Sequence, residues 1–146
     1  YNKYEISNYC KEGFECKHNL KYWNYDNYLG LGAGAHSLLY PERISNIIVV
    51  EKYIEKLQKN ELPLNETIIL DEKSAMEEFC FLGLRTNIGI DISKFNSFFE
   101  NNFVKVYGNK VRELINKDLL QKKGDRVSLT AKGQKYGNVV FTEFLL

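Results

Sequence analysis

LLQKKGDRVSLT, residues 119–130, decides how the C-terminal half of this 146-residue chain is expected to fold. Two short runs with apolar residues flank Gly124-Asp125, a dipeptide typical of a tight hairpin turn. Amphipathic helical patterns lie on both sides of the hairpin. We therefore expect two antiparallel strands enclosed by helices.

Three helices are expected before the hairpin. Asp71 can cap the first helix and Asp91 the second, where Ile90 would pack on Phe95 as a hydrophobic staple. The third is expected over residues 110–119. The inward positions are Ala75, Met76, Phe79, Cys80 and Leu82 on the first helix and Val111, Leu114 and Ile115 on the third.

One more helix is expected after the hairpin. Thr130 can cap it, and Tyr136, Val140 and Phe144 recur at every fourth position, which predicts one buried stripe. Three helices, a two-stranded wing and a final helix together predict a winged-helix-like domain over residues 66–146.

Residues 46–65 are expected to form a connecting helix and a linker. Asn46 would cap the helix, and Pro63 in NELPLN would end it. Glu55 and Lys59 are spaced to form a favourable pair one turn apart. The apolar face would consist of Ile47, Val50, Ile54 and Leu57.

Residues 1–45 are rich in Tyr, Asn and Gly and show no helical period. YEISNY (4–9) predicts a strand, and YLGLGAGA (28–35) predicts a buried strand that runs into a loop. There the glycines would let the backbone approach a ligand or a neighbouring strand. HNLKYW (18–23) is then expected to be the loop between these strands.

The overall composition excludes several classes of protein. The net charge of +1 favours neither nucleic acid nor an anionic membrane surface. No apolar run approaches the roughly 20 residues of a membrane helix. The three cysteines, Cys10, Cys16 and Cys80, are too few and too irregular for a disulfide framework and indicate a reducing, cytoplasmic setting. Because residue 1 is Tyr, we expect the chain to be part of a longer protein.

The glycine run and the two histidines are the candidate site residues. GLGAGA matches a dinucleotide fingerprint, but no helix follows it, so that interpretation is disfavoured. His18, Tyr22, Trp23 and His36 would each alone have an ordinary structural role, which residue chemistry by itself favours. Their clustering indicates a planar ligand, because imidazole binds metals and haem iron and aromatic rings supply flat walls.

Other functional classes find little support in the sequence. Lys110, Arg112 and Lys117 would lie where a winged helix contacts DNA, but Glu113 and Asp118 interrupt the basic stripe, which disfavours nucleic acid. No nucleophile–histidine arrangement, P-loop or HExxH motif is present, so a complete enzyme is not expected from this chain.

Several motifs occur together in order: YEISNY, GFECKHNLKYW, YLGLGAGAHS, EEFCFLGLRTNIGID and LLQKKGDRVSLTAKGQKYGNVVFTEFL. Over nearly its whole length the chain resembles the C-terminal part of radical-SAM proteins grouped with oxygen-independent coproporphyrinogen III oxidase. The HNxxYW element points to the haem-chaperone branch of that family. The alternative is a true oxidase, which converts coproporphyrinogen III to protoporphyrinogen IX.

The resemblance implies an α+β chain. Residues 1–45 would be the last strands of a partial TIM-like radical-SAM barrel, ahead of the winged-helix-like domain. The CxxxCxxC loop that binds the family's [4Fe–4S] cluster is absent, so this chain alone should be inactive toward S-adenosylmethionine.

The resemblance also implies ligands and partners. Cys10 and His36 would lie beside S-adenosylmethionine, His18 would bind haem iron, and Tyr22 and Trp23 would line the haem pocket. The implied partners are haem or a porphyrin and a haem-receiving protein. Unpaired strand edges would also allow two copies to dimerise.

Overall fold

The computed structural model describes all residues 1–146, which form two compact units. The first unit combines residues 1–25 with residues 72–146, and the second comprises residues 26–71. These units divide the chain differently from the domains expected at 1–45, 46–65 and 66–146, and the domain boundaries stay a prediction. Each unit is described by itself.

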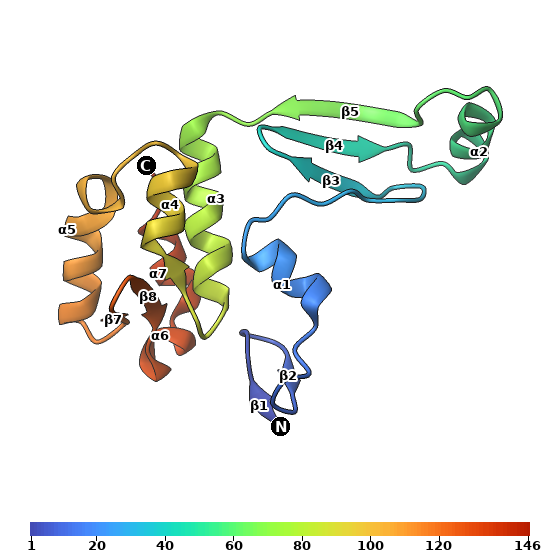
Figure 1. The fold of residues 1–146 in the computed structure, drawn as a ribbon. Helices are drawn as coiled ribbons and strands as arrows, with labels where there is room; N and C mark the ends of the chain where they lie inside the picture. The colour runs from blue at the N-terminus through green and yellow to red at the C-terminus, as the bar shows by residue number, and fades with distance from the viewer. The chain divides into compact units, whose positions relative to one another are not determined.

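The C-terminal part of the first unit is mostly helical, with a small sheet (Figure 1). Its three strands are antiparallel in the order β6-β8-β7. The elements in chain order are α3 Glu72–Arg85, β6 Ile90–Asp91, α4 Ile92–Phe98, α5 Phe103–Asn116, β7 Leu120–Lys123, β8 Arg126–Leu129, α6 Ala131–Lys135 and α7 Gly137–Thr142.

Three local signals in this part are confirmed: the hairpin turn and the helix caps at Asp91 and Thr130. The hairpin pairs Lys123 with Arg126 around Gly124, whose φ of +56° belongs to the left-handed region that glycine tolerates. The Asp91 carboxylate accepts a hydrogen bond from the Lys94 backbone N at 2.9 Å. The Thr130 hydroxyl likewise accepts one from the backbone N of Gly133 at 2.9 Å. Turn chemistry and helix caps therefore set these boundaries.

Two helix predictions are corrected here. The third helix begins at Phe103, earlier than expected, because Asn102 caps it by accepting from the Lys105 backbone N at 3.1 Å. The final helix is broken at Tyr136 into α6 and α7. Tyr136 is consequently exposed, whereas Val140 is buried as predicted.

An aromatic cluster forms the core of this part. Phe95 has no exposed surface and is the centre of the cluster. Its ring centroid lies 4.9 to 5.9 Å from those of Phe79, Phe99, Phe103 and Tyr107. Such edge and tilted contacts add to the apolar area that the rings bury.

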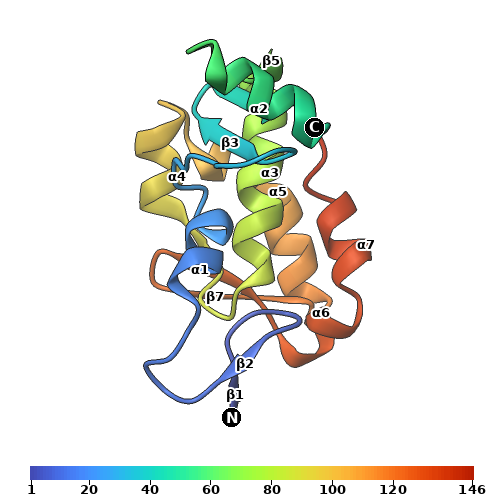
Figure 2. The same ribbon diagram turned by 90° about the vertical axis from the view of Figure 1, so that its right-hand side faces the viewer.

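The N-terminal part of the first unit differs from its prediction. It consists of a short hairpin, β1 Asn2–Lys3 with β2 Tyr9–Cys10, and the helix α1 Lys17–Trp23. The strand predicted over 4–9 is wrong, because residues 4–8 form the connection and turn Glu5 inward. The loop predicted over 18–23 is also wrong: HNLKYW is helical, and α1 packs against α3 (Figure 2).

The second unit is a three-stranded antiparallel sheet with one helix. Its strands are β3 His36–Leu39, β4 Glu42–Asn46 and β5 Leu64–Ile69, in the order β3-β4-β5. The helix α2 Val50–Gln58 begins later than predicted. Asn46 is no cap but a buried residue at the end of β4, and the Glu55–Lys59 pair is confirmed at 2.6 Å.

The glycine run is a loop and not the predicted buried strand. Asn46 holds it, because its side-chain amide donates to the carbonyl oxygens of Gly30 at 3.3 Å and Gly32 at 2.9 Å. A Cβ at Gly30 would lie 2.1 Å from the His36 carbonyl oxygen. The glycine therefore permits close approach to the neighbouring strand β3.

Across the chain, no helix combines the length and apolar character that a membrane crossing needs.

Candidate functional site

Helix α1 places His18 and Tyr22 one turn apart on the same face. The Tyr22 hydroxyl and Nε2 of His18 lie 2.8 Å apart in a hydrogen bond whose donor depends on the ring tautomer. The two rings meet edge to face, with centroids 4.9 Å apart. His18 is exposed. An accessible imidazole with a fixed orientation can bind a metal centre in an incoming ligand.

Trp23, at the end of α1, is half-buried and contacts Arg85 at the end of α3. The guanidinium carbon of Arg85 lies 4.5 Å from the centroid of the indole ring, in cation–π geometry. One face of the Trp23 ring is thereby covered by Arg85. The indole Nε1 is buried and has no hydrogen-bond partner in the structure.

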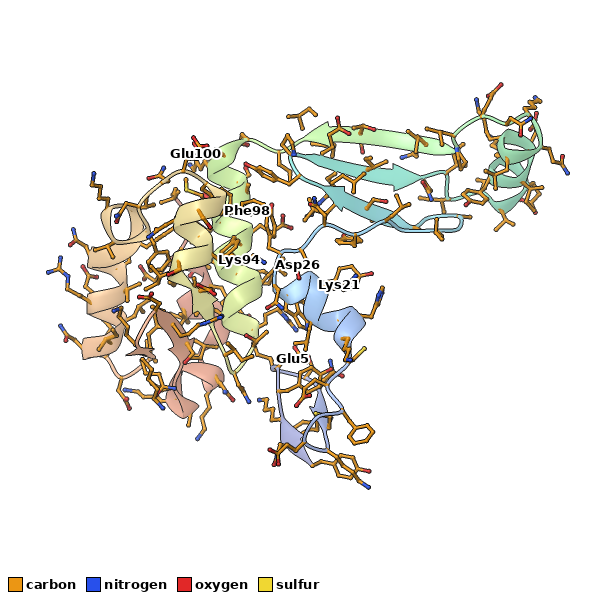
Figure 3. The ribbon with its side chains drawn as sticks, viewed as in Figure 1. Glu5, Lys21, Asp26, Lys94, Phe98 and Glu100 are labelled. Atoms are coloured by element: carbon orange, nitrogen blue, oxygen red, sulfur yellow. The ribbon has the colours of Figure 1, made fainter.

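Arg85 is held in turn by a buried carboxylate. Glu5 has no exposed surface, and its Oε2 lies 3.4 Å from Nη2 of Arg85. Its Oε1 accepts hydrogen bonds from the Ser7 backbone N and from Nδ2 of Asn8, both at 2.7 Å. Burial alone would raise the pKa of Glu5, but these hydrogen bonds and the Arg85 charge outweigh it and lower that pKa below its ordinary value. Figure 3 shows Glu5 where the N-terminal hairpin meets the rest of the unit.

A pocket with a volume of about 150 Å³ lies beside Trp23. Helices α1, α3 and α4 and strands β6 and β8 contribute to its wall. Two cations, Lys94 and Arg126, line it together with Asp91, Phe79 and Ile90. The pocket is therefore part apolar and part positively charged.

The residues expected beside S-adenosylmethionine lie in different units. Cys10 is buried on β2, where burial and the neighbouring Glu15 raise the pKa of its thiol. His36 is exposed on β3 of the second unit. No three His, Cys, Asp or Glu side chains come together as a metal site, so the donor set of this chain does not fit a [4Fe–4S] cluster.

No pattern in the sequence indicated that Glu5, Arg85, Lys94 and Arg126 would lie near Trp23. Glu5 and Arg85 meet across 80 positions of sequence. The His18–Tyr22 contact, by contrast, follows from spacing once the segment is known to be helical.

The chain is similar to several known proteins that are longer than it is. A family model described as the HemN C-terminal domain matches residues 70–135. The heme chaperone HemW of Lactococcus lactis is 44% identical over 146 residues, which is all of this chain and 38% of that protein. The heme chaperone HemW of Bacillus subtilis is 35% identical over 144 residues, covering 99% of this chain and 38% of that protein. The chain thus spans well under half the length of these relatives.

One solved structure has a similar fold. It is the coproporphyrinogen III oxidase HemN of Escherichia coli, described as a radical SAM enzyme. The TM-score is 0.60 at 18% identity, covering 82% of this chain and 28% of that one. At that identity the likeness concerns the fold alone, and it confirms the expected mixture of helices and strands.

Proposed function

We propose that this chain carries a haem-handling part of a chaperone. The reason is that it belongs to the radical-SAM family of the haem chaperone HemW and the coproporphyrinogen III oxidase HemN. Haem is the cargo in this proposal. His18 would bind its iron, and Tyr22 and Trp23 would border it.

One observation carries the proposal: the imidazole of His18 is exposed and oriented by Tyr22. A haem-iron ligand needs an accessible ring nitrogen and a ring held in one orientation. Haem would supply a Lewis-acidic iron to which the imidazole of His18 could bind. The role of α1 is to present the ligand, and Arg85 stacked on Trp23 keeps α1 against α3.

The finer fold assignments belong to the same proposal. Helix α3, strand β6, helices α4 and α5 and the β7–β8 hairpin, with the sheet order β6-β8-β7, support a winged-helix-like description of the C-terminal domain. In a DNA-binding module α5 would carry the contacts, but its Lys110 is paired with Glu143 at 2.7 Å, which weighs against that role. The barrel strands in residues 1–45, the S-adenosylmethionine contacts of Cys10 and His36, the haem-receiving protein and the dimer stay predictions.

Haem titration of the full-length protein tests the ligand assignment. We expect His18→Ala to lose the Soret shift of a histidine-bound haem and to weaken binding at least tenfold. Lys17→Ala, an exposed neighbour on α1, is the matched control and should bind like the wild type. An unchanged spectrum and affinity in His18→Ala would refute the assignment. Decarboxylation of coproporphyrinogen by the reconstituted protein would instead favour the oxidase.

The variant Tyr22→Phe tests which ring nitrogen of His18 binds the iron. The Tyr22 hydroxyl occupies Nε2 of His18, and an exposed hydrogen bond of this kind is worth about 0.5–1.5 kcal/mol. If iron binds through Nε2, removing the competitor should tighten haem binding by up to about tenfold. Weaker binding by Tyr22→Phe would instead indicate that Nδ1 is the ligand and that Tyr22 supports it.

A further inference from the structure

Helix α1 presents a lysine on the same face as His18. We propose that the ammonium group of Lys21 pairs with a propionate carboxylate of the haem whose iron His18 binds. This inference rests on the proposed haem-handling function. It makes Lys21 a specificity residue, which distinguishes haem from a porphyrin that has no free carboxylate.

The spacing along α1 sets Lys21 beside His18. Residues three positions apart in a helix lie about 60° apart around the axis and about 4.5 Å apart along it, so they are neighbours on the surface. Tyr22, four positions from His18, lies about 40° to the other side. Its hydroxyl contact with His18 at 2.8 Å confirms that this face is shared. The imidazole therefore has Tyr22 on one side and Lys21 on the other.

The direction of helical side chains favours the same contact. Every Cα–Cβ bond of a helix tilts toward the N-terminus, so a side chain covers the turn that precedes its own residue. The turn that precedes Lys21 begins at His18. The four-carbon stem of a lysine is flexible and ends in three donor protons. The ammonium can therefore lie beside a macrocycle that is centred over the imidazole.

The charge of Lys21 is available to a ligand. Its side chain is exposed (Figure 3), and its ammonium forms neither a hydrogen bond nor an ion pair in the structure. Helix α1 contains no acidic residue that could compete for it, and Lys17 adds a second positive charge. A carboxylate that approaches His18 from solvent therefore meets a positively charged helix.

Haem matches this arrangement at two points. Its iron accepts an imidazole nitrogen, and its two propionates project from one edge of the macrocycle. An ammonium and a carboxylate form a charge-assisted hydrogen bond, which is stronger than a neutral one. At an exposed site water and salt screen such a pair, so its contribution is modest. We therefore expect the bond from His18 to supply most of the affinity and Lys21 to select the free acid.

Haem and haem dimethyl ester, titrated into the full-length protein, test this contact. The ester keeps the iron and the ring but has no free carboxylate. We expect Lys21→Gln to weaken haem binding about two- to fivefold and the charge reversal Lys21→Glu about tenfold, because like charges repel. Neither variant should change the affinity for the ester or the Soret position, since His18 is retained. Salt at about 1 M should reduce both losses.

Lys17→Glu is the matched control. It reverses the same charge on the same helix, but this side chain leans off the N-terminal end of α1, away from the turn that begins at His18. Haem affinity should stay within about twofold of the wild type. Thermal melting establishes that each variant is folded. A lysine that only complemented the helix dipole would change the melting temperature and affect haem and ester equally.

The outcomes distinguish this inference from the proposed function. Unchanged haem affinity in Lys21→Glu, equal losses for haem and its ester, or an equal loss in Lys17→Glu overturns the pairing, while haem handling stands. A wild-type protein that binds neither haem nor the ester overturns the proposed function, and the pairing with it.

Discussion

The two compact units of this chain are stabilised in different ways. In the first, large aromatic side chains are fully buried around Phe95. In the second, helix α2 has no buried residue and every position of β5 is exposed. The buried residues of the second unit are Ser37, Leu38, Asn46 and Pro63.

This difference shows which forces set each structure. Apolar burial dominates the first unit, where each large side chain contributes about 1.5–3 kcal/mol. Backbone ladders and side-chain hydrogen bonds dominate the second, and each of those contributes only about 1 kcal/mol net. Truncating apolar side chains should therefore be costly in the core of the first unit and almost neutral on the exposed elements α2 and β5 of the second.

The largest effect should come from the centre of the aromatic cluster. Phe95→Ala removes a side chain with no exposed surface and leaves a cavity, so we expect a loss of about 4 kcal/mol in the free energy of unfolding. Urea unfolding followed by the fluorescence of Trp23, the one tryptophan of the chain, measures it in the same unit.

Ile54→Ala is the counterpart in α2, where the side chain is 47% exposed. We expect hydrogen exchange of residues 50–58 to change by no more than about 0.5 kcal/mol of local stability. Equal losses in the two variants would contradict the comparison, because they would mean that α2 has a buried apolar partner.

Substituting Glu5 should have the next largest effect on the free energy of unfolding, and the size of that effect should depend on pH. Because the folded-state pKa of Glu5 is lowered, its contribution is present above the unfolded pKa of roughly 4.3 and is lost as pH falls through the folded value. Near neutral pH we expect Glu5→Gln to cost about 2 kcal/mol, since hydrogen bonds to a charged group are lost. Below pH 4 the difference between variant and wild type should shrink.

Urea unfolding at pH 7 and pH 3.5 measures this dependence. Glu66→Gln, on the exposed strand β5 of the second unit, is the matched control and should leave the midpoint unchanged at both pH values. If the cost of Glu5→Gln stays the same at both, the Glu5–Arg85 contact does not depend on the carboxylate charge.

The elements that the sequence predicted correctly are those with local signals. Asp91 and Thr130 cap helices, and Gly124 allows a hairpin turn, within a few residues of the structure they set. Residues 4–9 and 18–23 were mispredicted because distant partners decide them. Glu5 turns inward to meet Arg85, and HNLKYW is helical where it packs on α3.

The candidate site likewise contains residues that the sequence indicated and residues that only the fold brings together. His18 and Tyr22 were singled out from sequence, and their contact follows from helical spacing. The pocket could not be anticipated, because Trp23, Lys94 and Arg126 come from separate elements that only the fold brings together. Asn46 was mistaken for a helix cap because Asn is common there, whereas its actual partners lie in the glycine loop.

The smallest expected effect on stability tests whether side-chain hydrogen bonds stabilise the second unit. Asn46→Ala removes the amide that donates to the carbonyl oxygens of Gly30 and Gly32, and of these two only the Gly32 oxygen keeps a backbone donor, the Ala35 N at 3.3 Å. We expect a local loss of about 1.4 kcal/mol, seen as roughly tenfold faster hydrogen exchange in residues 29–35. Asn65→Ala is the matched control, because this exposed amide makes only a 3.4 Å contact to Ser45 Oγ. If both variants exchange at the wild-type rate, backbone bonding alone holds the glycine loop, and side-chain ties are not what stabilises the second unit.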